Sequence, residues 1–254
     1  MHFTSQRLDD NVLERDFTLN EIPGILWTPE SASTSSPAPL ILLGHPGGLE
    51  RMRPRLVGRA RQAITDGFAA VTIELPGSGD RPVLPVLEQA RVELRTALHA
   101  GERPDEEVIE RLILPLVEQA VPEWQATMDA LLALPEIGGP IGYSGGIIAI
   151  GVRLALVEPR IAAAGLFAGS YVPRVMFDEA RQVTIPLHVL LQWDDVGNDR
   201  QLALDLFDAF GSPEKSLHAN MGGHTGVPRH AGEDASGFFA RHLRRDDGVE
   251  PSPM

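Results

Sequence analysis

The sequence predicts a single α/β domain, in which a mostly parallel central sheet carries helices on both faces. Short apolar runs, typical of buried strands, alternate with longer segments of helical periodicity. Glycine and proline mark the points where these runs end, as they do at turns. The 254 residues suit one large domain or two small ones, and no linker or internal repeat divides them. We therefore expect one domain over residues 1–245, followed by a disordered tail over 246–254.

The first half of the chain begins with antiparallel structure and then changes to strand-helix units. Residues 2–30 alternate apolar and polar positions well enough for two or three short antiparallel strands, the clearest being 24–28. After a polar loop at 31–39, a brief buried strand ends in the turn Gly44-His45-Pro46-Gly47-Gly48, and a helix follows. This strand, this helix and the next strand are expected at residues 40–43, 51–66 and 69–74.

The segment that follows is too long for a simple crossover between parallel strands. About sixty residues separate the strand at 69–74 from the next one, more than a single crossover helix needs. We expect three helices here, at residues 85–99, 105–120 and 122–134. The last has the position of the crossover helix, so the first two form a helical insertion at about 84–121. An insertion above the carboxyl edge of a sheet usually shapes a pocket.

The second half continues the alternation of strands and helices. A strand at 141–146 runs into an almost wholly apolar helix at 147–157, as expected for a helix buried behind a sheet. The later elements are a strand at 161–167, a linking segment with a short helix at 168–183, a strand at 185–191, a helix at 200–210, a strand at 215–220 and a closing helix to about residue 244. In a parallel sheet, the turns after these strands lie along one edge.

The segment Gly142-Tyr143-Ser144-Gly145-Gly146 has the G-x-S-x-G pattern of a nucleophile elbow. A sharp turn from strand to helix strains its central residue, and side chains at the flanking positions would collide with neighbouring elements. Ser144 would then lie at a helix N-terminus, where backbone N–H groups favour developing negative charge. The pattern predicts a nucleophilic serine.

Two more chemically suitable residues follow predicted strands. Asp195 and His224 come after Ser144 in the chain, and turns at one sheet edge can bring all three together. A histidine can accept the serine proton near neutral pH, and an aspartate on its far ring nitrogen fixes the tautomer. The order and placement of these residues therefore predict a Ser-His-Asp site.

Other carboxylates and histidines compete for the same roles. Asp194 and Asp199 are alternatives to Asp195, and Asp194 in particular stays open as the acid. His218 lies within a predicted strand and His230 inside the closing helix, so the loop position of His224 favours it as the base. Residues expected in other roles are His45, a structural hydrogen bonder of its turn, His188, a core residue, and Glu74, a carboxylate behind the site.

The composition narrows the possible chemistry and partners. Lys plus Arg total 22 against 35 Asp plus Glu, and the formal net charge of -13 disfavours nucleic acid and anionic membranes as partners. Cysteine is absent, which excludes disulfides, cysteine zinc sites and a thiol nucleophile. With no apolar signal core and no run of about 20 apolar residues, we expect a cytoplasmic protein. A Ser-His-Asp mechanism needs neither a metal nor an organic cofactor, and we expect none.

From the Gly44-His45-Pro46-Gly47-Gly48 turn through the elbow to Gly222-Gly223-His224, the chain resembles the α/β-hydrolase superfamily. Within it, the chain is similar to the dienelactone-hydrolase-like and small serine esterase branches. Matched by position, the resemblance implies Ser144 as nucleophile, Asp195 as acid and His224 as base. It covers nearly the full length of the chain.

The resemblance also implies that the backbone N–H groups of Gly47 and Gly145 form an oxyanion hole. Two positions depart from the family pattern. Dienelactone hydrolases use cysteine at the elbow, where this chain has Ser144. In the oxyanion turn, Pro46 replaces the glycine of many relatives and has no N–H to donate, so the donor is expected at Gly47 ahead of Gly48.

The expected function is hydrolysis of an ester, lactone or thioester of a small organic substrate through an acyl-enzyme on Ser144. Tyr143, Trp193 and Gly48 are expected to line the substrate pocket. Two alternatives remain open: the same triad used for cyclisation, acyl transfer or carbon-carbon bond cleavage, and a ligand-binding protein with an idle site. A small molecule is the expected partner, and the oligomeric state is open, a homodimer included.

Overall fold

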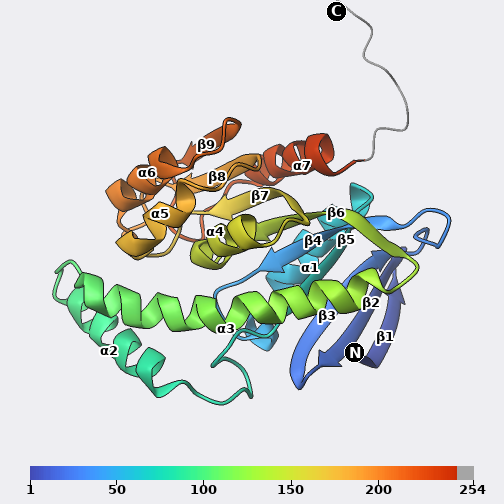
Figure 1. Ribbon diagram of the computed structural model, residues 1–254, viewed down its shortest axis with the longest axis horizontal. Coiled ribbons are helices and arrows are strands. Elements are labelled where there is room, and N and C mark those ends of the chain that lie inside the picture. The colour runs from blue at the N-terminus through green and yellow to red at the C-terminus, as the bar shows by residue number, and fades with distance from the viewer. Residues whose placement is uncertain (245–254) are drawn as a thin grey trace, which may run out of the picture.

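A nine-stranded sheet runs through the described residues in the order β1-β2-β3-β5-β4-β6-β7-β8-β9 (Figure 1). The computed structural model describes residues 1–244, so the tail predicted at 246–254 lies outside the described residues. The strands are β1 (His2–Asp9), β2 (Val12–Leu19), β3 (Ile22–Pro29), β4 (Ala38–Gly44), β5 (Ala69–Ile73), β6 (Ile137–Gly145), β7 (Ile161–Phe167), β8 (Leu187–Gln192) and β9 (Lys215–Asn220). This order confirms the predicted mixed sheet, antiparallel at its start and parallel from β5 to β9.

The antiparallel part consists of β1, β2 and β3, and β3 joins it to β5. The three strands fill the predicted span 2–30 and meet at tight turns, where Asp10, Asn11, Asn20 and Glu21 have positive φ. From β5 onward all neighbouring strands are parallel. The parallel strands at the centre are buried on both faces, which explains their nearly continuous apolar sequences.

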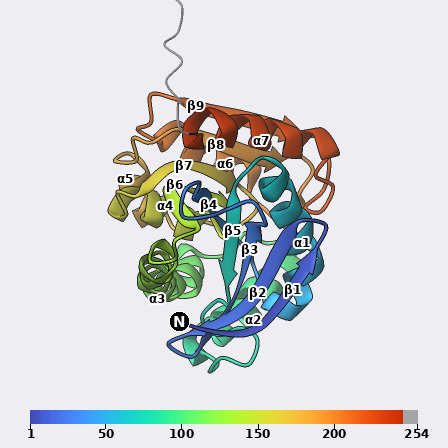
Figure 2. The same ribbon diagram turned by 90° about the vertical axis from the view of Figure 1, so that its right-hand side faces the viewer.

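Helices cover both faces of the sheet. They are α1 (Leu49–Thr65), α2 (Pro85–His99), α3 (Glu106–Leu132), α4 (Ile148–Val157), α5 (Phe177–Ala180) after a short 3-10 turn at Arg174–Met176, α6 (Arg200–Ala209) and α7 (Arg229–Leu243). One apolar cluster packs α1 and α7 against one face, and a larger cluster packs α3, α4, α5 and α6 against the other. Figure 2 shows α3, α4 and α5 on one side of the sheet and α1 and α7 on the other.

Between β5 and β6 the structure corrects the sequence prediction. The helices predicted at 105–120 and 122–134 are one helix, α3, of 27 residues with Pro115 and Pro122 inside it. A proline within a helix costs about 3 kcal/mol or more. The buried face of α3 continues from Val108 to Leu131, past both prolines. Burial of each large apolar side chain on this face contributes about 1.5–3 kcal/mol. The continuous apolar face therefore outweighs the two local breaks.

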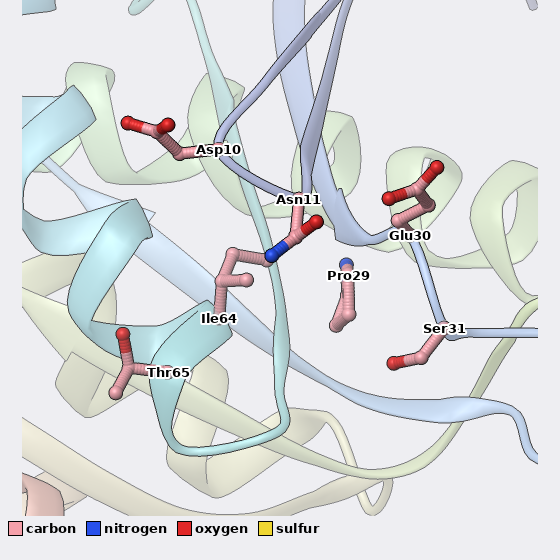
Figure 3. A pocket seen from close by; sticks show the side chains of 7 residues that line it. All are labelled: Asp10, Asn11, Pro29, Glu30, Ser31, Ile64 and Thr65. Carbon is pink, nitrogen blue, oxygen red and sulfur yellow. The ribbon is translucent and has the colours of Figure 1, made fainter.

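The amino and carboxyl ends of the parallel strands lie at opposite edges of the sheet, and different features lie at each. A hollow of about 500 Å³ lies where the β1–β2 turn, the end of β3 and the end of α1 meet (Figure 3). The end of β3 is paired near the start of β5, so this hollow lies at the edge opposite the carboxyl ends of the parallel strands. The turns after β4, β5, β6, β7 and β8 leave from the carboxyl edge, where the predicted chemistry should gather.

His188 lies within β8 and is only 4% exposed, as expected of a core residue. Its Nδ1 lies 3.3 Å from the Ser216 hydroxyl, and its ring packs against the rings of His218 and Phe238. Burial, and then the charge of His218, lower the pKa of His188 from 6.5 to about 4. The folded protein therefore keeps this imidazole neutral in mildly acidic solution.

We predict that His188→Gln makes the protein less sensitive to acid. Between about pH 6.5 and pH 4 the unfolded chain binds a proton at His188 that the folded protein does not bind, so stability falls as the pH falls. The variant should lose about 2 kcal/mol less free energy of unfolding over this range than the wild type. Urea unfolding at several pH values measures both curves, and parallel curves would contradict the prediction.

Candidate active site

The turn after β6 is where the predicted elbow lies. β6 ends at Gly145, and α4 begins at Ile148. Gly145 has a φ of 109°, whereas Ser144 is still part of the strand, opposite Leu43 of β4 and Gly165 of β7. The residue with left-handed backbone is therefore Gly145, one position after the serine, and not the central residue of the motif as predicted.

Gly145 also lies too close to its neighbours to carry a side chain. A β-carbon there would be 2.6 Å from a guanidinium nitrogen of Arg59 and 2.7 Å from the carbonyl oxygen of Gly44. Both distances are far below van der Waals contact, and the Gly44 atom belongs to the backbone of a central strand. Glycine is required here by conformation and by space together.

Ser144 is partly buried and contacts Arg59 of α1. One terminal nitrogen of Arg59 donates to the Ser144 carbonyl oxygen at 2.6 Å and approaches the Ser144 hydroxyl oxygen at 3.2 Å. The other terminal nitrogen donates to the Gly44 carbonyl at 2.8 Å. Burial lowers the pKa of Arg59 to about 10, so the side chain remains a cation at neutral pH.

Asp195 and His224 form a close pair at the same edge. His224 Nδ1 donates to Asp195 Oδ2 at 2.6 Å, and the other carboxylate oxygen accepts the Gly197 N–H at 3.2 Å. Asp195 is 8% exposed, and the His224 ring lies edge-on to Phe167, at the end of β7, with 5.4 Å between ring centres. This arrangement fixes the proton on Nδ1 and leaves Nε2 as the basic nitrogen.

The competing carboxylates and histidines lie elsewhere. Asp194 is exposed, and its N–H donates to the Gly222 carbonyl. Asp199 accepts the Leu202 N–H as the cap of α6. His218 Nδ1 lies 3.3 Å from an Asp234 carboxylate oxygen, and His230 is inside α7. Geometry thus selects Asp195 over Asp194 as the partner of His224.

Ser144 and His224 are not hydrogen-bonded to each other. Within residues 1–244, His224 Nε2 has no hydrogen-bond partner, and Arg59 is the side chain bound to the Ser144 hydroxyl. The structure therefore brings together the acid and the base that the sequence predicted. It places Ser144 near the end of β6, with its hydroxyl toward Arg59 of α1.

The turn after β4 is organised by two buried side chains. His45 Nε2 donates to the Ile73 carbonyl at 2.9 Å, and its Nδ1 accepts the Gly47 N–H at 3.4 Å. Burial lowers the pKa of His45, so the ring is neutral, as its predicted structural role requires. The predicted oxyanion donor Gly47 is thus engaged by a long hydrogen bond, while the Gly48 N–H has no partner in the described chain.

Glu74 has a part in the same turn. Its side chain is buried, and one carboxylate oxygen accepts the N–H of Leu49, the first residue of α1, at 3.0 Å. The other oxygen has no hydrogen-bond partner in the described residues. A carboxylate at a helix N-terminus is favourable, so Glu74 fixes where α1 begins relative to β5.

A hollow of about 380 Å³ lies beside the elbow. It is lined by Pro46, Gly47, Gly48, Arg51, Leu75, Pro76, Ser78, Arg91, Leu116 and Ile147. Arg91 of α2 and Leu116 of α3 come from the segment predicted to shape a pocket. Gly48, which was predicted to line the substrate pocket, lines this hollow. The interpretation of Tyr143 as a pocket residue is wrong, because its ring is fully buried in the apolar core. Trp193 does not line this hollow and is partly buried beneath the Arg200 guanidinium.

Among residues 1–244, no group of three or more histidine, aspartate or glutamate side chains is placed to hold a metal ion. No helix in this part of the chain is long and apolar enough to cross a membrane.

Solved structures share this architecture, although no protein-family model and no curated protein matches the chain. A cold-adapted esterase from an Arctic intertidal metagenomic library is 26% identical, with a TM-score of 0.70 over 96% of this chain and 100% of that one. Acetyl xylan esterase 1 from a Thermoanaerobacterium species is 12% identical, with a TM-score of 0.63 over 94% and 87%. A dienelactone hydrolase from Anabaena variabilis is 19% identical, with a TM-score of 0.59 over 91% and 99%. The chain has the α/β-hydrolase fold.

Arg59 contacts the elbow but was not among the site residues predicted from the sequence. Helix α1 carries five arginines, and nothing in their spacing says which of them turns toward the sheet. Arg53 and Arg61 pair with carboxylates of β1 and β2, at Glu14, Asp16 and Asp9. The only available signal was the unusual number of arginines in an acidic chain.

We predict that Gly145→Ala destabilises the protein by about 2–4 kcal/mol, because the methyl group requires a strained φ and displaces Arg59 or the Gly44 carbonyl. Gly58→Ala is the matched control, since that glycine lies within α1 with no atom near the added methyl group. It should be neutral or stabilising by about 0.5–1 kcal/mol. Thermal or urea unfolding measures both, and a Gly145→Ala protein of wild-type stability would contradict the assigned geometry.

Proposed function

We propose that this protein is a serine hydrolase that cleaves an ester, lactone or thioester of a small organic substrate. The observation that carries the proposal is the hydrogen-bonded pair of Asp195 and His224, in which the carboxylate is buried and His224 Nε2 has no hydrogen-bond partner in the described residues. This pair lies at the same edge of the sheet as Ser144, which is near the end of β6. Esterases among the similar structures support the same reaction class, including one at 26% identity over nearly the whole chain. The fold alone would not support this reaction class, because proteins that share this fold carry out many different reactions.

In the proposed reaction Ser144 attacks the carbonyl carbon while His224 Nε2 accepts the hydroxyl proton. The tetrahedral intermediate then collapses: the bond to the leaving alcohol or thiol breaks, that group takes the proton from His224, and the acyl group stays on Ser144. His224 next accepts a proton from water as the water attacks the acyl carbon, and it returns the proton to Ser144 when the acid is released. Asp195 keeps the imidazole in the required tautomer and stabilises the imidazolium form. For this reaction the Ser144 hydroxyl must turn from Arg59 toward His224.

Backbone N–H groups at the same edge would bind the oxyanion. Gly145 supplies one of them, as the residue after the proposed nucleophile. For the second, Gly47 must exchange its 3.4 Å hydrogen bond to His45 for the oxyanion, whereas the Gly48 N–H is without a partner in the described residues. The hollow of about 380 Å³ beside both turns is of a size that suits a small organic substrate.

We predict that a fluorophosphonate probe labels the wild-type protein and not Ser144→Ala, because the probe reacts covalently with an activated serine. Ser170→Ala is the control, since Ser170 follows β7 at the same edge but its hydroxyl is buried without a hydrogen-bond partner in the described chain. Intact-protein mass spectrometry measures the adduct. Absence of an adduct on the folded wild type would refute the nucleophile assignment.

A second pair of variants tests the acid. Asp195→Asn should lower turnover of p-nitrophenyl acetate at least about 100-fold, because the amide no longer selects the right imidazole tautomer. Asp194→Asn changes the neighbouring, exposed carboxylate in the same way and should stay within about twofold of the wild type. Equal losses in the two variants would argue against a specific role for Asp195.

One observation favours a second candidate function, a ligand-binding protein without catalysis. The Ser144 hydroxyl is bound to Arg59 rather than to His224, and the apex of the turn carries no side chain. If the site is idle, the wild type should resist the fluorophosphonate probe and turn over none of a series of short-chain esters. Binding of such esters, detected by calorimetry and unchanged in His224→Ala, would then support this alternative.

A further inference from the structure

We propose that Arg59 is a positioning residue of the site, which holds the ends of β4 and β6 together and so fixes Ser144 relative to the oxyanion turn. The inference rests on the proposed function for its catalytic consequence. Its structural content, a clamp between two strand ends, is independent of that function. We call the Arg59 guanidinium with the Gly44 and Ser144 carbonyls the strand clamp.

The geometry of the strand clamp follows the shape of the guanidinium group. Its two terminal nitrogens bind two carbonyl oxygens on adjacent strands, Gly44 at 2.8 Å and Ser144 at 2.6 Å. The planar fork of an arginine presents donors at a fixed separation, which a lysine cannot do. Because His45 follows Gly44 and Gly145 follows Ser144, the clamp lies directly before both turns that would build the oxyanion hole.

The charge of Arg59 makes this placement unusual. Within residues 1–244, Arg59 has no aspartate or glutamate partner, although carboxylates outnumber basic residues in the chain by 35 to 22. Arg53 and Arg61, on the same helix, both form ion pairs. A partly buried cation without a counterion is costly, and only its hydrogen bonds to the strand ends compensate for this here. A role in holding Ser144 in place would explain why the chain keeps an unpaired cation at position 59 despite this cost.

The contact with the Ser144 hydroxyl fits a positioning role. The same nitrogen donates to the Ser144 carbonyl at 2.6 Å and only approaches the hydroxyl at 3.2 Å. The carbonyl bond is the stronger of the two, so the hydroxyl can leave Arg59 while the backbone stays held. Arg59 can therefore keep the Ser144 backbone in place while the hydroxyl moves.

Gly145 completes the arrangement. An added β-carbon there would lie 2.6 Å from the Arg59 nitrogen, so the guanidinium occupies space that a side chain at the apex of the turn would need. The clamp and the bare apex therefore depend on each other. This explains why the strained residue of the turn is the glycine and the serine precedes it.

The test compares Arg59→Met with Arg59→Lys, and with Arg61→Met as the matched control. Arg61 lies on the same helix in an exposed ion pair with Asp9, so its loss should change the fluorophosphonate labelling rate less than about twofold. Arg59→Met should lower the labelling rate and kcat at least about tenfold with KM nearly unchanged, because binding is intact and positioning is lost. Arg59→Lys can bind one carbonyl at a time, so its labelling rate and kcat should lie between those of Arg59→Met and the wild type.

A second readout does not depend on catalysis. Amide hydrogen exchange should become faster in Arg59→Met at both strand ends, in peptides covering residues 43–49 and 143–149, and stay unchanged in β8 and β9. Labelling equal to the wild type, or equal loss in Arg59→Met and Arg61→Met, would overturn the inference. If the wild type itself is not labelled, the proposed function fails, and unchanged exchange at the two strand ends would refute the clamp separately. Should Arg59→Met not fold, the Arg59→Lys protein provides the same comparison.

Discussion

The parallel pairing of β4 with β6 brings two glycine-rich turns out of the sheet at one point. Gly44 lies opposite Gly145 in this pairing, so the turn that begins at His45 and the turn after Ser144 start side by side. Both strands are central, and helices cover both of their faces, which leaves their backbones little freedom. The site inherits its precision from this register, because a slip of one residue would separate the serine from the oxyanion turn and reverse its side chain.

Buried polar groups around these turns bind mainly to the backbone. His45 bonds to the Ile73 carbonyl, Glu74 to the Leu49 amide and Arg59 to the carbonyls of Gly44 and Ser144. Such bonds fix where a loop begins in a way that exposed ion pairs do not, since leaving a buried polar group without a partner costs about 1–3 kcal/mol. Asp195 and His224 differ, because their bond joins two side chains from loops after β8 and β9.

The fold could be predicted because its signals are local and repeated. The strands at 161–167 and 215–220 and the helix at 85–99 have the predicted bounds, since apolar runs and turn residues define them clearly. The prediction failed where a long-range effect opposed a local one. Pro122 ends a helix by its local chemistry, but the sheet and α2 bury a stripe on both sides of it, and α3 continues. At the edge of the sheet, the choice between Asp195 and Asp194 was also beyond local reasoning, because both follow the same strand.

By itself the sequence determined which residue types reach the carboxyl edge: a serine among glycines, an aspartate and a histidine, each at or just beyond the end of a strand of a parallel sheet. Their order along the chain and the period of the apolar positions are properties of the chain alone. Only the tertiary structure decided which atoms face one another: His224 toward Asp195, Ser144 toward Arg59, and Gly145 rather than Ser144 at the apex of the turn. The physical reason is that side-chain direction depends on strand register and helix rotation, which are set by packing between segments far apart in the sequence.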